Sequence, residues 1–220
     1  MVSVLAPTLA RAQDDLRHWS RYFGRVTRPG PLSFGIYAEL RLQDNASTIN
    51  DFFVGPKIGY KLSDYIVFGG ALKYILLRTS TLEQWQRLEL EVNPQLRPFG
   101  KEWQVQLRNR VEFVRISNDK EPDEWRTRAR HRLTLSRDLE GAGPLDLVYA
   151  SNELIWGQTF FESRNAVIIT ENRFVPFAAR LRLSEIAKIS VFYMLRSSNE
   201  ADPWLREHTL GTFLSITPRG

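Results

Sequence analysis

Two segments of this sequence, 103–113 and 125–133, alternate so regularly between polar and apolar residues that they restrict the possible folds severely. In the first segment the odd positions are mostly apolar and the even positions are polar or charged. The second carries four arginines on one face, Arg126, Arg128, Arg130 and Arg132. Successive side chains of a strand point to opposite faces, so the arginines of each segment point the same way. Charges this dense are rare in a packed core, and the pattern favours a membrane β-barrel with an apolar outside and a polar lumen.

The same alternation, bounded by turn residues, predicts nine further strands. They cover residues 16–26, 32–42, 52–62, 65–77, 85–92, 145–156, 172–183, 187–196 and 208–216. Tight turns such as 97–100 and 140–143 alternate with longer polar connections such as 43–50 and 78–84, which is typical of bacterial barrels. An odd number of strands cannot close with antiparallel pairs alone. We therefore expect a closed antiparallel transmembrane barrel of 12 strands, with 10 as the alternative.

The length and composition fit one exported domain. The chain has 220 residues and no cysteine, so it forms no disulfide and no cysteine-ligated metal site. No stretch approaches the roughly 18 uninterrupted apolar residues of a membrane helix. Residues 1–12 resemble the end of a signal peptide, with a small-x-small cleavage site at Ala10-Arg11-Ala12. We expect the barrel to cover 13–220 and to lie in a bacterial outer membrane.

The charged faces predict a network inside the lumen. The 30 basic residues are 24 Arg and 6 Lys, and Arg is preferred where a cation pairs with carboxylates in a partly dry setting. The members expected on adjacent strands are Arg87, Glu89, Glu91, Arg108, Arg110, Glu112, Arg126, Arg128, Arg130, Arg132 and Glu153. One interpretation is a salt-bridge lattice that fills and rigidifies a narrow barrel. The other is a constriction that prefers small anions.

Tryptophans near the predicted strand ends indicate an aromatic belt at the lipid headgroups. They are Trp85, Trp103, Trp125, Trp156 and Trp204. Such a belt implies contact with outer-membrane lipid and lipopolysaccharide, and insertion by the barrel-assembly machinery.

Signs of catalysis, metal binding or nucleic-acid binding are weak. His131 and His208 share the apolar faces of their strands, and the spacing suggests no serine–histidine pair with either of them or with His18. No histidine or cysteine cluster predicts a metal site, and no glycine loop predicts a nucleotide cofactor. The acidic segment 118–124 is predicted to be a solvated loop. The alternative is that it weakly binds a Ca²⁺ ion that bridges it to lipopolysaccharide. The basic residues are interleaved for a lumen, which argues against nucleic acid.

Several short motifs occur in the order found in a known family. They are Trp19, Glu39-Leu40-Arg41, Leu107-Arg108-Asn109-Arg110-Val111-Glu112, Arg128-Ala129-Arg130-His131-Arg132-Leu133, Ala150-Ser151-Asn152-Glu153-Leu154 and Glu171-Asn172-Arg173-Phe174. In these motifs the chain resembles the bacterial outer-membrane β-barrel family catalogued as domain of unknown function 2490, over most of residues 16–216. The resemblance implies an outer-membrane barrel and brings no established activity.

Three functions follow as hypotheses. The first is a structural or narrow anion-preferring barrel of the outer membrane, without enzymatic activity. The second is an outer-membrane enzyme that modifies lipid or lipopolysaccharide. The third is a soluble β-barrel that binds a ligand inside.

Overall fold

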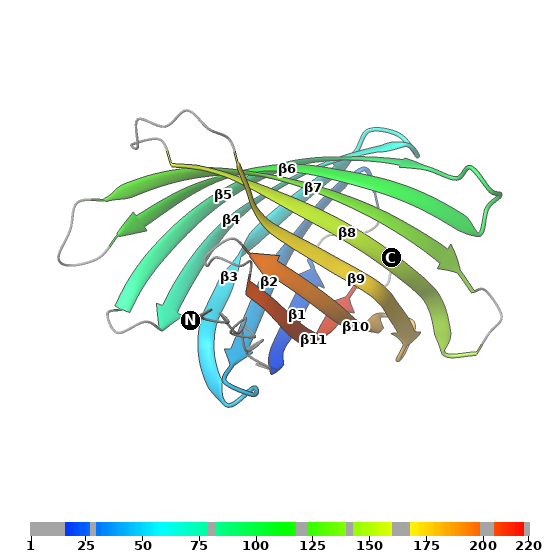
Figure 1. Ribbon diagram of the computed structural model, residues 1–220. Helices are drawn as coiled ribbons and strands as arrows, with labels where there is room; N and C mark the ends of the chain where they lie inside the picture. The colour runs from blue at the N-terminus through cyan, green and yellow to red at the C-terminus, as the bar shows by residue number, and fades with distance from the viewer. Residues whose placement is uncertain are drawn as a thin grey trace, which may run out of the picture.

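The chain folds into a barrel wall made only of strands (Figure 1). The computed structural model describes residues 16–26, 30–78, 82–117, 123–139, 143–159, 168–198 and 205–217. Within these residues the strands are β1 (Leu16–Arg25), β2 (Leu32–Gln43), β3 (Thr48–Lys61), β4 (Ile66–Arg78), β5 (Leu82–Leu96), β6 (Trp103–Ser117), β7 (Glu124–Asp138), β8 (Leu145–Thr159), β9 (Ile168–Arg182), β10 (Ala187–Ser198) and β11 (Leu205–Ile216). Each predicted strand corresponds to one of them, so the alternation predicted the secondary structure well.

The expected strand number of 12, or 10, is wrong, because the barrel closes with eleven strands in the described part of the chain. Ten neighbouring pairs are antiparallel, and β1 pairs with β11 in parallel, from Leu16 opposite His208 to Gly24 opposite Ile216. The parallel pair resolves the parity problem because both strands run in the same direction. Closure matters physically, since an open edge would leave a row of backbone N–H and C=O groups unpaired.

Because the number of strands is odd, the start of β1 and the end of β11 lie at opposite ends of the barrel. We call these the Leu16 end and the Ile216 end. The connections β2–β3, β4–β5, β6–β7, β8–β9 and β10–β11 lie at the Leu16 end, and the other connections lie at the Ile216 end.

The predicted alternation of short and long connections holds only in part. β3 begins at Thr48, and β4 ends at Arg78 just before β5 begins at Leu82, so strands occupy much of the expected loops 43–50 and 78–84. The expected turn at 97–100 is confirmed, and its Gly100 lies in the left-handed region with φ 92°. Of the expected turn 140–143 only Gly143, with φ 71°, lies within the described residues. Strands β5 to β9 have 15 residues each and β1 has 10, so the wall is tallest opposite the closing seam.

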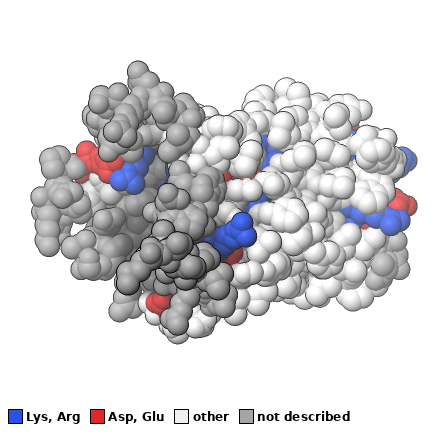
Figure 2. All heavy atoms as spheres, in the orientation of Figure 1, with Lys and Arg blue, Asp and Glu red and all other residues white. Residues whose placement is uncertain are grey.

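The barrel is inverted relative to a soluble protein, with polar residues inside and apolar residues outside. Lumen-facing Glu89, Glu112 and Arg110 are 2%, 0% and 6% exposed, whereas their outward neighbours Leu90 and Val111 are 52% and 39% exposed. The described part of the surface in Figure 2 is accordingly mostly uncharged. The exposed apolar residues of the strands include Tyr22, Leu32, Phe34, Ile36, Phe52, Ile58, Tyr60, Phe68, Leu72, Tyr74, Leu88, Leu90, Leu107, Val111, Phe113, Leu133, Leu135, Phe174, Phe177, Val191, Leu210 and Ile216.

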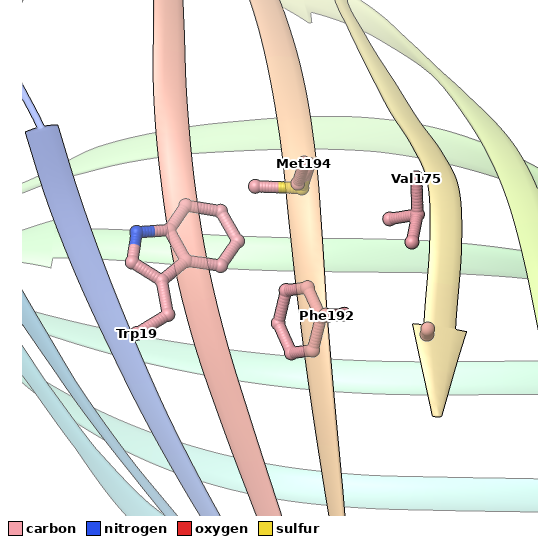
Figure 3. Packing of buried hydrophobic residues seen from close by; sticks show 5 residues of the cluster. Trp19, Val175, Phe192 and Met194 are labelled. Atoms are coloured by element: carbon pink, nitrogen blue, oxygen red, sulfur yellow. The ribbon is translucent and has the colours of Figure 1, made fainter. Parts of the chain in front are cut away.

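A small apolar cluster inside the lumen lies across the closing seam (Figure 3). Trp19 of β1, Gly211 of β11 and Phe192 of β10 are register partners in one row across the three strands. Because Gly211 has no side chain, the buried Trp19 and Phe192 extend over β11 toward each other, and Met194 packs beside them. A Cβ atom built at Gly211 would collide with the Phe192 ring. The glycine thus permits the packing that joins the first strand to the last two.

We expect Gly211→Ala to destabilise the barrel by about 1–3 kcal/mol, because the added methyl group overpacks the row between Trp19 and Phe192. Equilibrium urea unfolding in detergent micelles would measure the loss. The matched control is Gly24→Ala at the outer face of β1, where an added Cβ meets no atom within 4 Å. Equal stability of the two variants would contradict the packing role of Gly211.

Candidate functional site

The candidate site is a lattice of charged side chains that fills the lumen at mid-height. At its centre lie Glu89 of β5, Glu112 of β6 and Glu153 of β8, which are 2%, 0% and 5% exposed. The strands bring them together because each carboxylate occupies a lumen-facing position of its strand, next to lumen-facing arginines of the neighbouring strands. Cross-strand pairs of opposite charge attract, so the register itself assembles the network.

Arg130 is the link between two of these carboxylates. Its Nη1 donates to Oε1 of Glu112 at 2.8 Å, and its Nη2 donates to Oε2 of Glu153 at 2.6 Å. Glu112 also has Arg128 Nη2 at 3.1 Å. Glu153 also pairs with Arg108. Arg is suited to this position because its planar fork can reach two carboxylates at once.

The lattice continues around the barrel through Arg110 of β6. Arg110 Nη1 lies 2.8 Å from Glu89 Oε2, and Arg110 Nη2 donates to Glu91 Oε2 at 2.7 Å. Lys73 Nζ of β4 lies 2.8 Å from Glu89 Oε1, and Lys57 Nζ of β3 lies 3.2 Å from Glu91 Oε1. The central carboxylates therefore each hold cations from more than one strand, which ties non-adjacent strands together across the lumen.

A second acidic group closes the network toward the Leu16 end. Glu171 of β9 pairs with Arg173, and Arg196 Nε donates to Glu171 Oε1 at 2.7 Å. Arg196 Nη1 also donates to Glu207 Oε2 of β11 at 2.5 Å. These side chains are buried or nearly so, and they occupy the space between the central lattice and the Leu16 end.

Aromatic rings accommodate part of the excess positive charge. The guanidinium carbons of Arg41, Arg173 and Arg21 lie 4.2, 4.9 and 5.1 Å from the centroid of the Trp19 ring. Arg41 also lies 4.5 Å from the centroid of Phe53. Cations are attracted to the faces of aromatic rings, and the attraction is stronger when water is excluded. Trp19 therefore connects the seam to the charged lattice.

Ten of the eleven residues expected in the lumen network face the lumen. Nine of them form ion pairs there, namely Arg87, Glu89, Glu91, Arg108, Arg110, Glu112, Arg128, Arg130 and Glu153. The tenth, Arg132, lines a cavity of the lumen. Arg126 lies elsewhere, because it is near the end of β7, has an exposed side chain and pairs with Glu124 with Nε–Oε1 at 2.6 Å. A residue near the end of a strand can share the face of the lumen residues and still lie outside the lumen. The alternation of residues along a strand does not distinguish these two positions.

The tryptophans expected in the belt divide between the two faces of the wall. Trp103, near the Ile216 end, and Trp125 and Trp156, near the Leu16 end, have the parity of outward-facing residues. Trp85 lies opposite the buried residues Ile75 and Ile116, on the lumen side of β5. Trp204, residues 1–12 and most of the acidic segment 118–124 lie outside the described residues.

Between the lattice and the Ile216 end the lumen contains a cavity of about 590 Å³. Its lining includes twelve Lys or Arg residues and three Glu residues, so its surroundings are strongly positive. The cations of the lining come from β1 to β7 and from β9, and the aromatic rings of Phe23, Phe192 and Phe213 come from β1, β10 and β11. A cavity of this size can hold a small molecule.

One serine–histidine pair escaped the sequence analysis. His18 Nε2 and Ser20 Oγ of β1 lie 2.8 Å apart, because residues two apart on a strand share a face. Thr212 Oγ1 donates to Ser20 Oγ at 3.5 Å. His131 bonds Asn109 with Nδ1–Oδ1 at 2.8 Å, and His208 bonds Tyr193, all on the outer face. The lipid-modifying enzyme remains a prediction. Such an enzyme needs a nucleophile and a base within hydrogen-bond distance, and this outward-facing pair has that spacing.

The described part of the chain contains no group of three or more His, Cys, Asp or Glu residues that could hold a metal ion. The same residues include no helix of the length and apolarity needed to cross a membrane.

Several members of the lattice were missed by the sequence analysis. They are Arg21, Arg41, Lys57, Lys73, Asp51, Arg173, Glu171, Arg196 and Glu207. Their strand parity carried a signal, since each lies on the polar face of its strand. The missing information was which strands face one another across the lumen, since the closed sheet places β1, β2, β9, β10 and β11 opposite β5 to β7.

The chain belongs to the family described as protein of unknown function DUF2490, whose pattern matches residues 16–206. This match confirms the family suggested by the motifs. Among curated proteins, no sequence matches this chain.

We expect Glu112→Gln to destabilise the barrel by about 3–5 kcal/mol, because it leaves Arg128 and Arg130 without the charge of a fully buried carboxylate. Urea unfolding in detergent micelles would measure the change. The control is Glu124→Gln, whose half-exposed pair with Arg126 should contribute less than about 1 kcal/mol. A loss for Glu112→Gln as small as that of the control would show that the lattice does not stabilise the fold.

Proposed function

We propose that this member of the DUF2490 family is a barrel of the bacterial outer membrane whose charged lumen is sealed by the salt-bridge lattice. The observation that carries the proposal is the inversion of the wall. Many large apolar side chains of the strands are about 40–60% exposed, while charged groups are buried. Exposed apolar area of this extent is unfavourable in water and favourable against lipid.

The dimensions of the wall support the same proposal. A membrane-spanning strand needs about 9–11 tilted residues. The strands have 10 to 15 residues, so even the shortest of them, β1, is long enough. Closure of the sheet also satisfies the backbone of every strand, as lipid requires.

The placement of tryptophans adds support. Trp103 lies on the outer face near the Ile216 end, and Trp125 and Trp156 lie on it near the Leu16 end. Aromatic residues concentrate at both boundaries of a membrane, where the ring is half in lipid. The apolar surface would then lie between these two levels.

Membrane insertion predicts a depth-dependent cost of charge on the outer face. Leu90→Arg, near the middle of β5, should destabilise the barrel in lipid vesicles by about 2–4 kcal/mol. Leu96→Arg, at the end of β5 and 59% exposed, should cost no more than about 1 kcal/mol. Unfolding from vesicles by urea would compare them.

A soluble barrel would give a different result, because both leucines would be exposed to water and both substitutions would be nearly neutral. Recovery of the folded protein from cell extracts without detergent would likewise favour the soluble ligand-binding alternative over the membrane proposal.

A narrow anion-preferring channel is the second candidate, favoured by the excess of cations in the lumen. The buried lattice leads us to expect no steady conductance from the wild-type protein in planar bilayers. A steady current with anion preference, reduced by Arg128→Ala and by Arg130→Ala, would instead establish the channel. The same recordings with Arg137→Ala, an exposed rim position, control for general effects of charge removal.

A further inference from the structure

We propose that the cavity near the Ile216 end binds a small organic oxyanion, most simply a phosphate monoester, through Arg21, Arg108 and Arg132. The inference deepens the proposed function, since the cavity belongs to the same lumen, but it does not require that the wall be in lipid.

The first observation is a like-charge pair facing the cavity. Arg108 of β6 and Arg132 of β7 are direct register partners, and both line the cavity. Like charges directly opposite each other on neighbouring strands repel. A similar like-charge pair on the same two strands, Arg110 opposite Arg130, is neutralised by four carboxylates. These are Glu89, Glu91, Glu112 and Glu153.

The second observation is that no carboxylate of the described residues forms a direct ion pair with Arg132. The carboxylate opposite it, Glu153, is already shared by Arg108, Arg130 and Arg173. Among the described residues no carboxylate oxygen lies within 4.0 Å of the Arg132 guanidinium nitrogens. A partly buried cation without a paired carboxylate is unfavourable, and a ligand oxyanion would supply the missing charge.

The third observation concerns unused donors. The Nε atoms of Arg108 and Arg132 are buried and have no hydrogen-bond partner within the described part of the chain, and the same holds for Arg25, Arg87 and Arg130 around this cavity. Arg21 Nε lies 3.2 Å from Oε2 of Glu39. Arg21 and Arg132 also line a small recess of about 30 Å³ together with Tyr149. Buried donors without partners are rare in folded proteins, and a group of them around one cavity indicates an absent acceptor. Phosphate and carboxylate oxygens match the guanidinium fork.

The shape of the cavity decides between a bare ion and a larger molecule. Its volume of about 590 Å³ far exceeds a phosphate ion, and Phe23, Phe192 and Phe213 line the side formed by the seam. An organic group attached to the oxyanion would pack against these rings. We therefore expect an organic phosphate to bind more tightly than inorganic phosphate, by about two- to tenfold.

Calorimetry in detergent micelles would test the site with two probes, inorganic phosphate and phenyl phosphate. Arg132→Met should weaken the binding of both by about tenfold or more, since a hydrogen bond to a charged group is lost. It should not lower the unfolding midpoint of the ligand-free barrel, because it removes the repulsion from Arg108. Arg137→Met, an exposed rim variant of the same strand, should bind both probes as the wild type does.

The alternatives give opposite results. If Arg132 only supports the lattice, Arg132→Met lowers the ligand-free unfolding midpoint and the wild type binds neither probe. Equal binding of phosphate and phenyl phosphate would show a site for the free ion and overturn the organic ligand. A failure of the membrane proposal would appear in the Leu90→Arg comparison and leave these binding results unchanged.

A measurement on the wild-type protein does not depend on whether the variant folds. Phenylglyoxal reacts with accessible guanidinium groups, and mass spectrometry locates the modified residues. We expect modification of Arg132 without ligand and at least fivefold slower modification with saturating phenyl phosphate. Arg110, which is held by Glu89 and Glu91, should react little in either state. Modification of Arg132 at the same rate with and without phenyl phosphate would overturn the site.

Discussion

The fold depends on the neutralisation of arginine by carboxylates that have almost no contact with water. An isolated charge in such a setting would be too costly, so most lattice arginines are held by acids, many of them on neighbouring strands. Arg130 illustrates the arrangement, since its two terminal nitrogens engage Glu112 and Glu153 from the strands on either side. Attraction between the charges and the strand register reinforce each other, because a slip of one residue would turn these groups to the apolar outside.

The closing seam solves a different problem by other means. The parallel pair β1–β11 joins the ends of the chain, where Trp19, Gly211 and Phe192 form one row. Here apolar packing replaces ion pairs. The guanidinium groups of three arginines also lie near the Trp19 ring. The seam and the lattice are therefore one continuous structure, in which the indole bridges the apolar and the charged parts of the lumen.

The sequence was sufficient to predict the strands and which face of most of them is polar, because a period of two is visible in the residues themselves. It predicted a closed barrel but not the parallel pair by which the barrel closes. Nothing local distinguishes a parallel partner for β1 from an additional twelfth strand, and the expectation of 12 strands was wrong for that reason. Position along the strand was also invisible: Arg126 shares the parity of Arg128 but lies at the rim, and Trp85 has the parity of Arg87. The pair His18 and Ser20 was missed although the period of two places residues two apart on one face of a strand.

The lattice and the cavity follow from one asymmetry in where the lumen acids lie. Toward the Leu16 end, Asp51, Glu171 and Glu207 join the central carboxylates, and the interior there is filled by paired side chains. Toward the Ile216 end, Asp146 is already engaged by Arg180 and Lys188, with Nε–Oδ1 and Nζ–Oδ2 distances of 2.6 and 2.8 Å. Cations on that side therefore outnumber the acids, and mutual repulsion keeps long arginines from closing the space between them. The cavity lies on the side where cations exceed acids, so the residue types that pair in the lattice also line a positive space within the lumen.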